Sequence, residues 1–171
     1  HIFTYEYVRD VVSFTKERAS FVKDFWTVAS YLFVAPQDFE VFGIKAGASA
    51  EPQTADSRRQ ADPRAKVYDD SLTAPFLAKD VDKFWKPEIA ELVSRVSDFV
   101  TAYDGEWSVA SVGSAIEEFI RSNEWPMGKV MNAVRLALAG SASGLGIADI
   151  IVRIGKDEIE RRISFARSRL G

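Results

Sequence analysis

Apolar side chains recur at three- and four-residue intervals in block after block of this 171-residue chain, and glycine or proline separates the blocks. One block follows Pro87, with apolar residues at positions 89, 92, 93, 96 and 100. This spacing places them on one face of a helix, and proline suits the first turn. The chain has neither a β-hairpin signature nor a repeat period. The pattern therefore predicts an all-α fold, a bundle of about six to eight helices.

The first predicted helical block runs from about Tyr5 to Phe33. Its apolar face would hold Val11, Phe14, Phe21 and Phe25, and Arg18 interrupts that face. Because an unpaired buried charge is costly, Arg18 has three alternatives. It lies at the helix edge, pairs with a carboxylate, or faces a ligand.

Residues 43–75 break the helical pattern. Glycine and proline lie there among small and polar residues, and acidic residues largely offset the basic ones. This composition predicts an inserted, mobile loop. We expect a first helical subdomain over residues 1–100, which contains the insertion, and a second over residues 101–171.

The second half shows clear helix boundaries. Ser108 is a plausible N-cap, and Asn123 ends that block. The next helix has apolar residues at 127, 130, 131, 134 and 138, with Arg135 at the edge of the apolar face, and it stops at Gly140. A glycine-rich loop, residues 141–146, follows, whose backbone amides we expect to be open to a ligand. Two short helices, separated by Gly155, complete the chain.

Composition narrows the class of protein. The chain has no cysteine, no 18-residue apolar run for a membrane span and no secretory signal, so we expect a cytoplasmic protein without membrane contact. The net charge is −3, which argues against an indiscriminate DNA or RNA binder. Six basic and three acidic residues follow position 152, so this tail carries +3 and the remainder −6. An ordinary solvated helix explains such a tail, and so does a phosphate-binding surface.

The sequence offers no catalytic constellation. Its single histidine is His1, so neither a histidine triad nor a histidine-rich metal site can be assembled. The loop at 140–146 lacks the lysine and hydroxyl of a P-loop, and Asp149 stands where a dinucleotide fingerprint needs glycine. We predict no catalytic residue, no metal ligand and no cofactor site in this chain.

Two segments together resemble a known family. The segment from Met127 to Gly140, followed by Gly-Lys-Asp-Glu at 155–158 and the Arg161-Arg162 pair, resembles the carboxy-terminal end of bacterial glutamyl-tRNA synthetases. The segment from Lys16 to Phe33 looks like the opening of the anticodon-binding region of the same enzymes. Their catalytic signatures, His-Ile-Gly-His and Lys-Met-Ser-Lys-Ser, do not occur here.

This resemblance implies an anticodon-binding fragment of a glutamate–tRNA ligase. Its partners would be the anticodon loop of glutamate tRNA and a catalytic domain in the same polypeptide, which uses ATP and magnesium. In such enzymes the arginine matching Arg18 meets the third anticodon base. The positions that match the contacts to the other anticodon bases are Arg135, Gly144, Leu145 and Ile147. Phosphate contacts are expected from the basic tail, at Arg153, Lys156, Arg161 and Arg162.

A different class remains open, a helical protein-interaction module that has lost RNA recognition. Its anchors would be exposed aromatic residues. The candidates are Trp26, Trp85, Trp107 and Trp125, although tryptophans in such patterns more often lie in a core.

Overall fold

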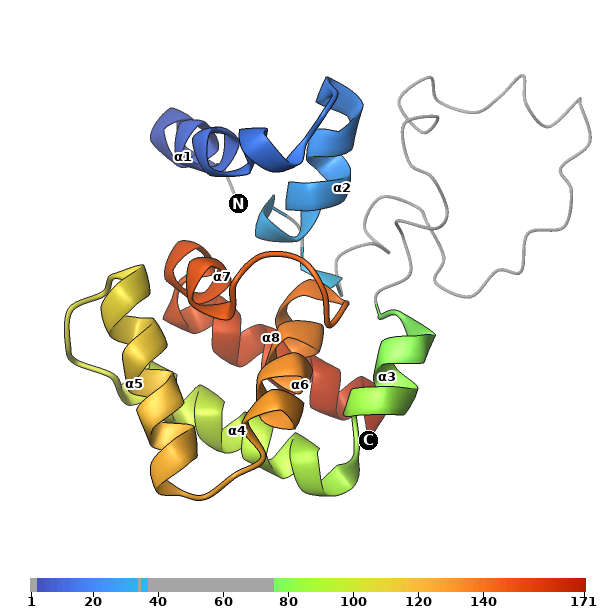
Figure 1. Ribbon diagram of the computed structural model, residues 1–171, viewed down its shortest axis with the longest axis vertical. Helices are drawn as coiled ribbons and strands as arrows, with labels where there is room; N and C mark the ends of the chain where they lie inside the picture. The colour runs from blue at the N-terminus through green and yellow to red at the C-terminus, as the bar shows by residue number, and fades with distance from the viewer. Residues whose placement is uncertain (1–2, 34, 37–75) are drawn as a thin grey trace, which may run out of the picture.

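The computed structural model describes residues 3–33, 35–36 and 76–171, apart from the side chains of residues 22, 23, 26 and 27. Within these ranges the chain contains helices and no strand, as predicted (Figure 1). The helices are α1 (Tyr5–Thr15), a 3-10 turn η1 (Lys16–Arg18), α2 (Val22–Phe33), α3 (Ala78–Phe84), α4 (Pro87–Ala102), α5 (Val109–Ser122), α6 (Met127–Ala139), α7 (Ile147–Ile154) and α8 (Lys156–Leu170). None of them is long and apolar enough to cross a bilayer.

Helix ends in the second half follow their local signals. Pro87 is the first residue of α4, and the Ser108 hydroxyl accepts a hydrogen bond from the Ser111 amide at 3.2 Å, which caps α5. Gly140 ends α6 in the left-handed conformation, with φ of 79°. Gly155 separates α7 from α8 with φ of 81°. These four predicted boundaries are confirmed.

Helix α6 occupies the middle of the bundle. It contacts α2, α3, α4, α5, α7 and α8, and Figure 1 shows it between α4 on one side and α7 on the other. Its buried residues accordingly lie on several faces, namely Val130, Ala133, Val134, Leu136, Ala137 and Leu138. The end of α6 is therefore positioned by nearly every other helix.

The core does not divide near residue 100. Helix α4 packs on α6 and α8, and one hydrophobic cluster joins Val11 and Leu32 from the first half to Ile159 and Ile163 from the second. The predicted pair of subdomains with a boundary at 100/101 is thus not reflected in the packing. Residues 43–75, predicted to be an inserted loop, lie outside the described residues.

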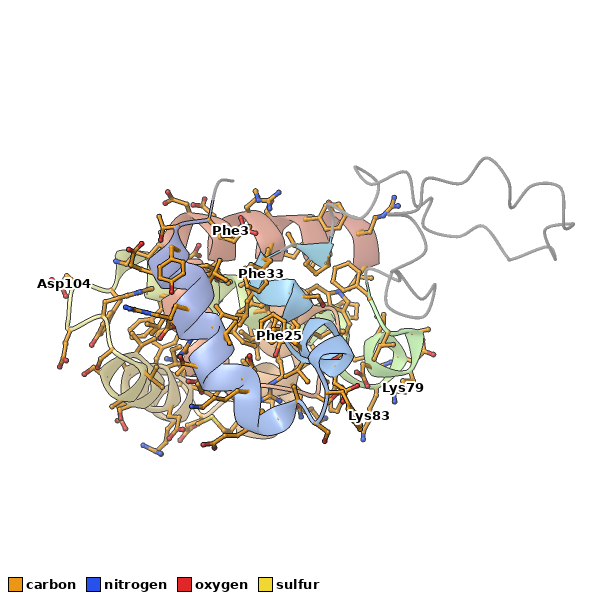
Figure 2. All side chains as sticks on the ribbon, turned by 90° about the horizontal axis from the view of Figure 1, so that it is seen from above. Phe3, Phe25, Phe33, Lys79, Lys83 and Asp104 are labelled. Atoms are coloured by element: carbon orange, nitrogen blue, oxygen red, sulfur yellow. The ribbon has the colours of Figure 1, made fainter. Side chains whose placement is uncertain are left out.

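The block predicted from Tyr5 to Phe33 is two helices rather than one. The chain turns at Lys16–Phe21, and α2 runs back beside α1. Aromatic rings fill the space between the two helices, where Figure 2 shows Phe3, Phe25 and Phe33 together. Phe21, expected on the apolar face, lies in the turn with 67% of its surface exposed.

Helix α3 was not predicted, because the sequence pattern resumed only at Pro87. It is short, and the amide of Leu77, the residue just before it, donates to the Gly140 carbonyl at 2.8 Å. This bond places α3 against the end of α6.

Candidate functional site

The segment between α6 and α7, residues 140–146, is the point where the predicted site residues gather. We call it the α6–α7 loop. Gly144 is exposed and has φ of 122°, which side chains with a Cβ rarely adopt. A Cβ at this position would also come within 3.3 Å of the Tyr31 hydroxyl. Glycine is therefore strongly favoured at position 144.

Helices distant in the sequence hold the loop. The Asp80 carboxylate of α3 accepts a hydrogen bond from the Ala142 amide at 2.8 Å. The Tyr31 hydroxyl of α2 accepts one from the Leu145 amide at 3.3 Å. The expectation of a loop with freely available amides is therefore wrong for Ala142 and Leu145, whose amides already have acceptors.

Arg135 fastens the same loop from inside the bundle. Its Nε donates to the Leu145 carbonyl at 3.1 Å, and its Nη1 donates to the Ala142 carbonyl at 2.9 Å and to Asn132 at 3.2 Å. The half-buried side chain confirms its place at the edge of the apolar face. In this structure its guanidinium shapes the loop rather than pointing toward a ligand.

Arg18 lies on the outside of the loop. It belongs to η1, its side chain is exposed, and its Nη1 donates to the Gly144 carbonyl at 3.4 Å. A bond of that length is weak, so the guanidinium can exchange it for a better acceptor. Two predicted site residues that are 126 positions apart in the chain thus meet at the surface.

Leu145 and Ile147 do not join them. Both side chains are buried in the core, Leu145 completely. Their side chains contribute packing, and both Leu145 backbone groups are already hydrogen-bonded within the protein. A ligand contact of these two residues could therefore involve only the backbone of Ile147, and it stays a prediction.

The structure also corrects the phosphate-contact prediction for Arg162. Only 3% of its surface is exposed. Nε donates to Glu158 at 2.6 Å, and Nη1 donates to the carbonyls of Tyr31 at 2.7 Å and Leu138 at 2.6 Å. Arg162 thus ties α8 to the ends of α2 and α6. A buried cation satisfied in this way is a structural element and not a phosphate ligand.

The other basic residues predicted for phosphate contact also have partners within the protein. Arg153 pairs with Asp10 at 3.1 Å and Asp149 at 3.3 Å, and its guanidinium lies 3.9 Å from the Phe14 ring centre. The Lys156 ammonium donates to the carbonyls of Thr101 and Tyr103. Arg161 is exposed and forms a two-pronged pair with Glu158. Binding a phosphate would require each of these three residues to give up a partner within the protein. Their phosphate contacts stay a prediction.

Burial and neighbouring charges shift the pKa values of two side chains in this region, Tyr31 and Glu158. Burial raises the pKa of Tyr31, although the hydrogen bond from the Leu145 amide and the charges of Arg18 and Arg135 oppose the shift, so the hydroxyl is neutral at neutral pH. Burial alone would raise the pKa of Glu158. Hydrogen bonds from Arg161 and Arg162 outweigh it and lower that pKa below its ordinary value.

Two lysines on α3, the helix whose Asp80 anchors the loop, were not predicted as site residues. Lys79 and Lys83 are exposed on α3, and Figure 2 shows both at the outer edge of that helix. Their four-residue spacing on one helix face was the available signal. Among the described residues, no group of three or more histidine, cysteine or acidic side chains is arranged to hold a metal ion.

Tryptophan burial bears on the interaction-module alternative. Trp85 is buried, and Trp107 and Trp125 are half-buried against the core. The side chain of Trp26 lies outside the described part. The three described tryptophans are therefore core residues and not exposed anchors.

Comparison with known proteins identifies the class of fold. A family model described as an anticodon binding domain matches residues 64–167. The solved structure of a glutamate tRNA ligase from Elizabethkingia meningosepticum, in complex with its amino acid, superposes with a TM-score of 0.69 at 24% identity. That match covers 99% of this chain and 26% of the other. This likeness confirms the all-helical fold.

Curated relatives agree with it. The chain is 24% identical over 156 residues to a glutamate–tRNA ligase of Cytophaga hutchinsonii, which covers 91% of this chain and 23% of the relative. It is 29% identical over 160 residues to that of Flavobacterium johnsoniae, covering 94% of this chain and 24% of the relative. The chain therefore spans about a quarter of the length of the relatives it matches.

Proposed function

Because the chain belongs to the family of anticodon-binding domains, we propose that it recognises the anticodon loop of glutamate tRNA within a glutamate–tRNA ligase. The catalytic domain of the same polypeptide would join glutamate to the tRNA with ATP and magnesium, in the cytoplasm. This chain supplies recognition and no catalytic group to that reaction.

The observation that carries this proposal is the meeting of Arg18 with Gly144 at the surface of the α6–α7 loop. An exposed guanidinium offers several donors in one plane and also stacks on flat rings. Unpaired bases in RNA loops present both edges and faces to such a group. Arg18 would exchange its weak bond to Gly144 for the edge of the third anticodon base.

We expect the residues that support the loop to affect this contact indirectly. They are Arg135, Tyr31 and Asp80. They hold the loop by its backbone, so they set the position of Gly144 without touching RNA themselves. Replacing one of them would weaken every base contact equally, whereas replacing Arg18 would change the preference at one base.

Phosphate contacts are assigned to the exposed lysines of α3 in place of the buried Arg162. Lys79 and Lys83 are exposed on α3, the helix whose Asp80 anchors the loop. Such contacts position the RNA backbone without reading sequence. Asp82, exposed on the same helix, opposes them.

A binding experiment tests the proposal. Anticodon stem-loops that differ only at the third anticodon base are titrated against the parent chain and Arg18→Ala. We expect the parent to prefer the cognate base by about 1 to 3 kcal/mol and the variant to lose that preference. Arg9→Ala is the matched control, because Arg9 is an exposed arginine on the neighbouring helix α1, and it should leave the preference intact.

Equal affinity of the parent for all stem-loops would contradict base reading by Arg18. In that case the protein-interaction module becomes the better description.

A further inference from the structure

Phe21 is exposed where the sequence pattern expects burial. Its exposed fraction of 67% is exceeded among the large apolar side chains of the described residues only by Tyr5 at 75%. Full burial of a phenylalanine is worth about 1.5 to 3 kcal/mol, so this position gives up most of that stabilisation. About two thirds of the residue's surface is therefore in contact with solvent.

The backbone beneath the ring is firmly placed. The Asp24 carboxylate accepts a hydrogen bond from the Phe21 amide at 3.0 Å, and the Asp24 amide donates to the Phe21 carbonyl at 2.9 Å. This reciprocal pair caps the start of α2. Phe21 thus projects from an ordered helix start rather than from a frayed end.

Its location relative to Arg18 points to the kind of ligand. Phe21 follows Arg18 by three residues, so their Cα atoms are at most about 11 Å apart. Both residues belong to the turn between α1 and α2, and Arg18 of that turn reaches the Gly144 carbonyl of the α6–α7 loop. An exposed flat ring and an exposed cation in one turn are the groups that hold unpaired nucleotides, with one base stacked and a neighbouring edge hydrogen-bonded.

We propose that Phe21 is the stacking platform for an unpaired base adjacent to the one that Arg18 contacts. This inference rests on the proposed anticodon-loop function and adds a residue and a contact type to it. Stacking accepts any base, because every base has an aromatic face. Phe21 therefore contributes affinity and orientation, and Arg18 contributes the choice of base.

The test uses the whole 171-residue chain and a glutamate anticodon stem-loop with 2-aminopurine placed at one loop position at a time. Stacking on the ring quenches this fluorescent base at one position in the parent. Phe21→Leu keeps an apolar side chain but removes the flat face. It is expected to weaken binding about 5- to 150-fold and to abolish the quenching at that position.

Two further variants test whether binding and quenching depend on the aromatic ring at position 21. Phe21→Tyr retains a flat face and is expected to bind within about threefold of the parent, with the quenching intact. Tyr5→Leu removes an equally exposed ring from α1 and is expected to change neither affinity nor quenching. Because the ring touches no phosphate, the dependence of affinity on salt should be the same for Phe21→Leu and the parent.

The outcomes separate the two proposals. If the parent fails to bind the stem-loop, the proposed function is wrong and this inference with it. If the parent binds and Phe21→Leu binds equally well, the anticodon proposal stands and the stacking role is overturned. Phe21 would then be a contact for another protein surface.

Discussion

At the level of single residues, three of the predicted site arginines differ in where they lie, one at the surface and two inside the protein. Arg18 is exposed, Arg135 holds the α6–α7 loop and Arg162 is buried. All three were predicted to lie near a ligand because most acceptors of Arg135 and Arg162 are backbone carbonyls, which every residue type carries. For Arg162 a signal existed: it lies on the same helical face as Ile159 and Ala166, both buried, which predicts burial.

The buried pair of Arg162 and Glu158 gives a prediction for stability. Glu158→Ala leaves the buried guanidinium without its charged partner, so we expect a loss of about 3 to 5 kcal/mol in the free energy of unfolding. Urea denaturation followed by circular dichroism measures this loss. Glu91→Ala is the control, because its pair with Arg95 is exposed and should be worth less than about 1 kcal/mol.

The free energy of unfolding should fall at acid pH because Glu158 becomes protonated. The pKa of Glu158 is lowered in the folded state, so its stabilising effect is present above the unfolded pKa of about 4.3 and is lost as pH falls through the lower, folded value. Urea unfolding at a series of pH values from about 6 downward tests this. Glu158→Gln is expected to show a shallower loss of stability in this range, and an unchanged slope would be inconsistent with it.

At the level of elements, local signals predicted the helix ends that depend on one residue. Ser108, Gly140 and Gly155 act within a few residues of their own position, so the sequence carries them directly. The break between α1 and α2 was missed because the turn contains neither glycine nor proline. Its signal was Asp24, whose carboxylate reaches back three residues to Phe21.

Two glycine substitutions should have opposite effects. Gly144→Ala places a side chain at φ of 122° and 3.3 Å from the Tyr31 hydroxyl, so we expect about 1 to 3 kcal/mol of destabilisation and weaker stem-loop binding. Gly128→Ala adds a methyl group in α6 with no atom within 4 Å and should stabilise the protein by about 0.5 to 1 kcal/mol. Thermal unfolding of both variants tests the pair, and a Gly144→Ala variant as stable as the parent would contradict the assigned loop conformation.

At the level of the whole molecule, the distribution of charge along the sequence did not predict which basic side chains are free to bind phosphate. The basic tail suggested a phosphate-binding surface, yet Arg153, Lys156 and Arg162 are committed to acceptors within the protein. The fold class was predictable because helical periodicity is local. The position of the candidate site was not, because it depends on which helices meet the end of α6.

Binding of the stem-loop is expected to be weak and to fall with rising salt. The double variant Lys79→Ala/Lys83→Ala should reduce the slope of log affinity against log salt by about 1 for each phosphate that a lysine no longer neutralises. Asp82→Asn, on the same helix, should change affinity in the opposite direction because it removes a negative charge beside the lysines. Titrations at several salt concentrations give these slopes, and a slope unaltered in the double variant would remove α3 from the interface.

The manner in which the α6–α7 loop is held has a consequence for protein engineering. Its conformation is imposed by Tyr31, Asp80 and Arg135, which arrive from three helices spread over more than a hundred residues. Transplanting residues 140–146 into a foreign scaffold would leave these supports behind. A graft of the heptapeptide alone should therefore lose its shape, and the smallest portable unit is the helical assembly that surrounds it.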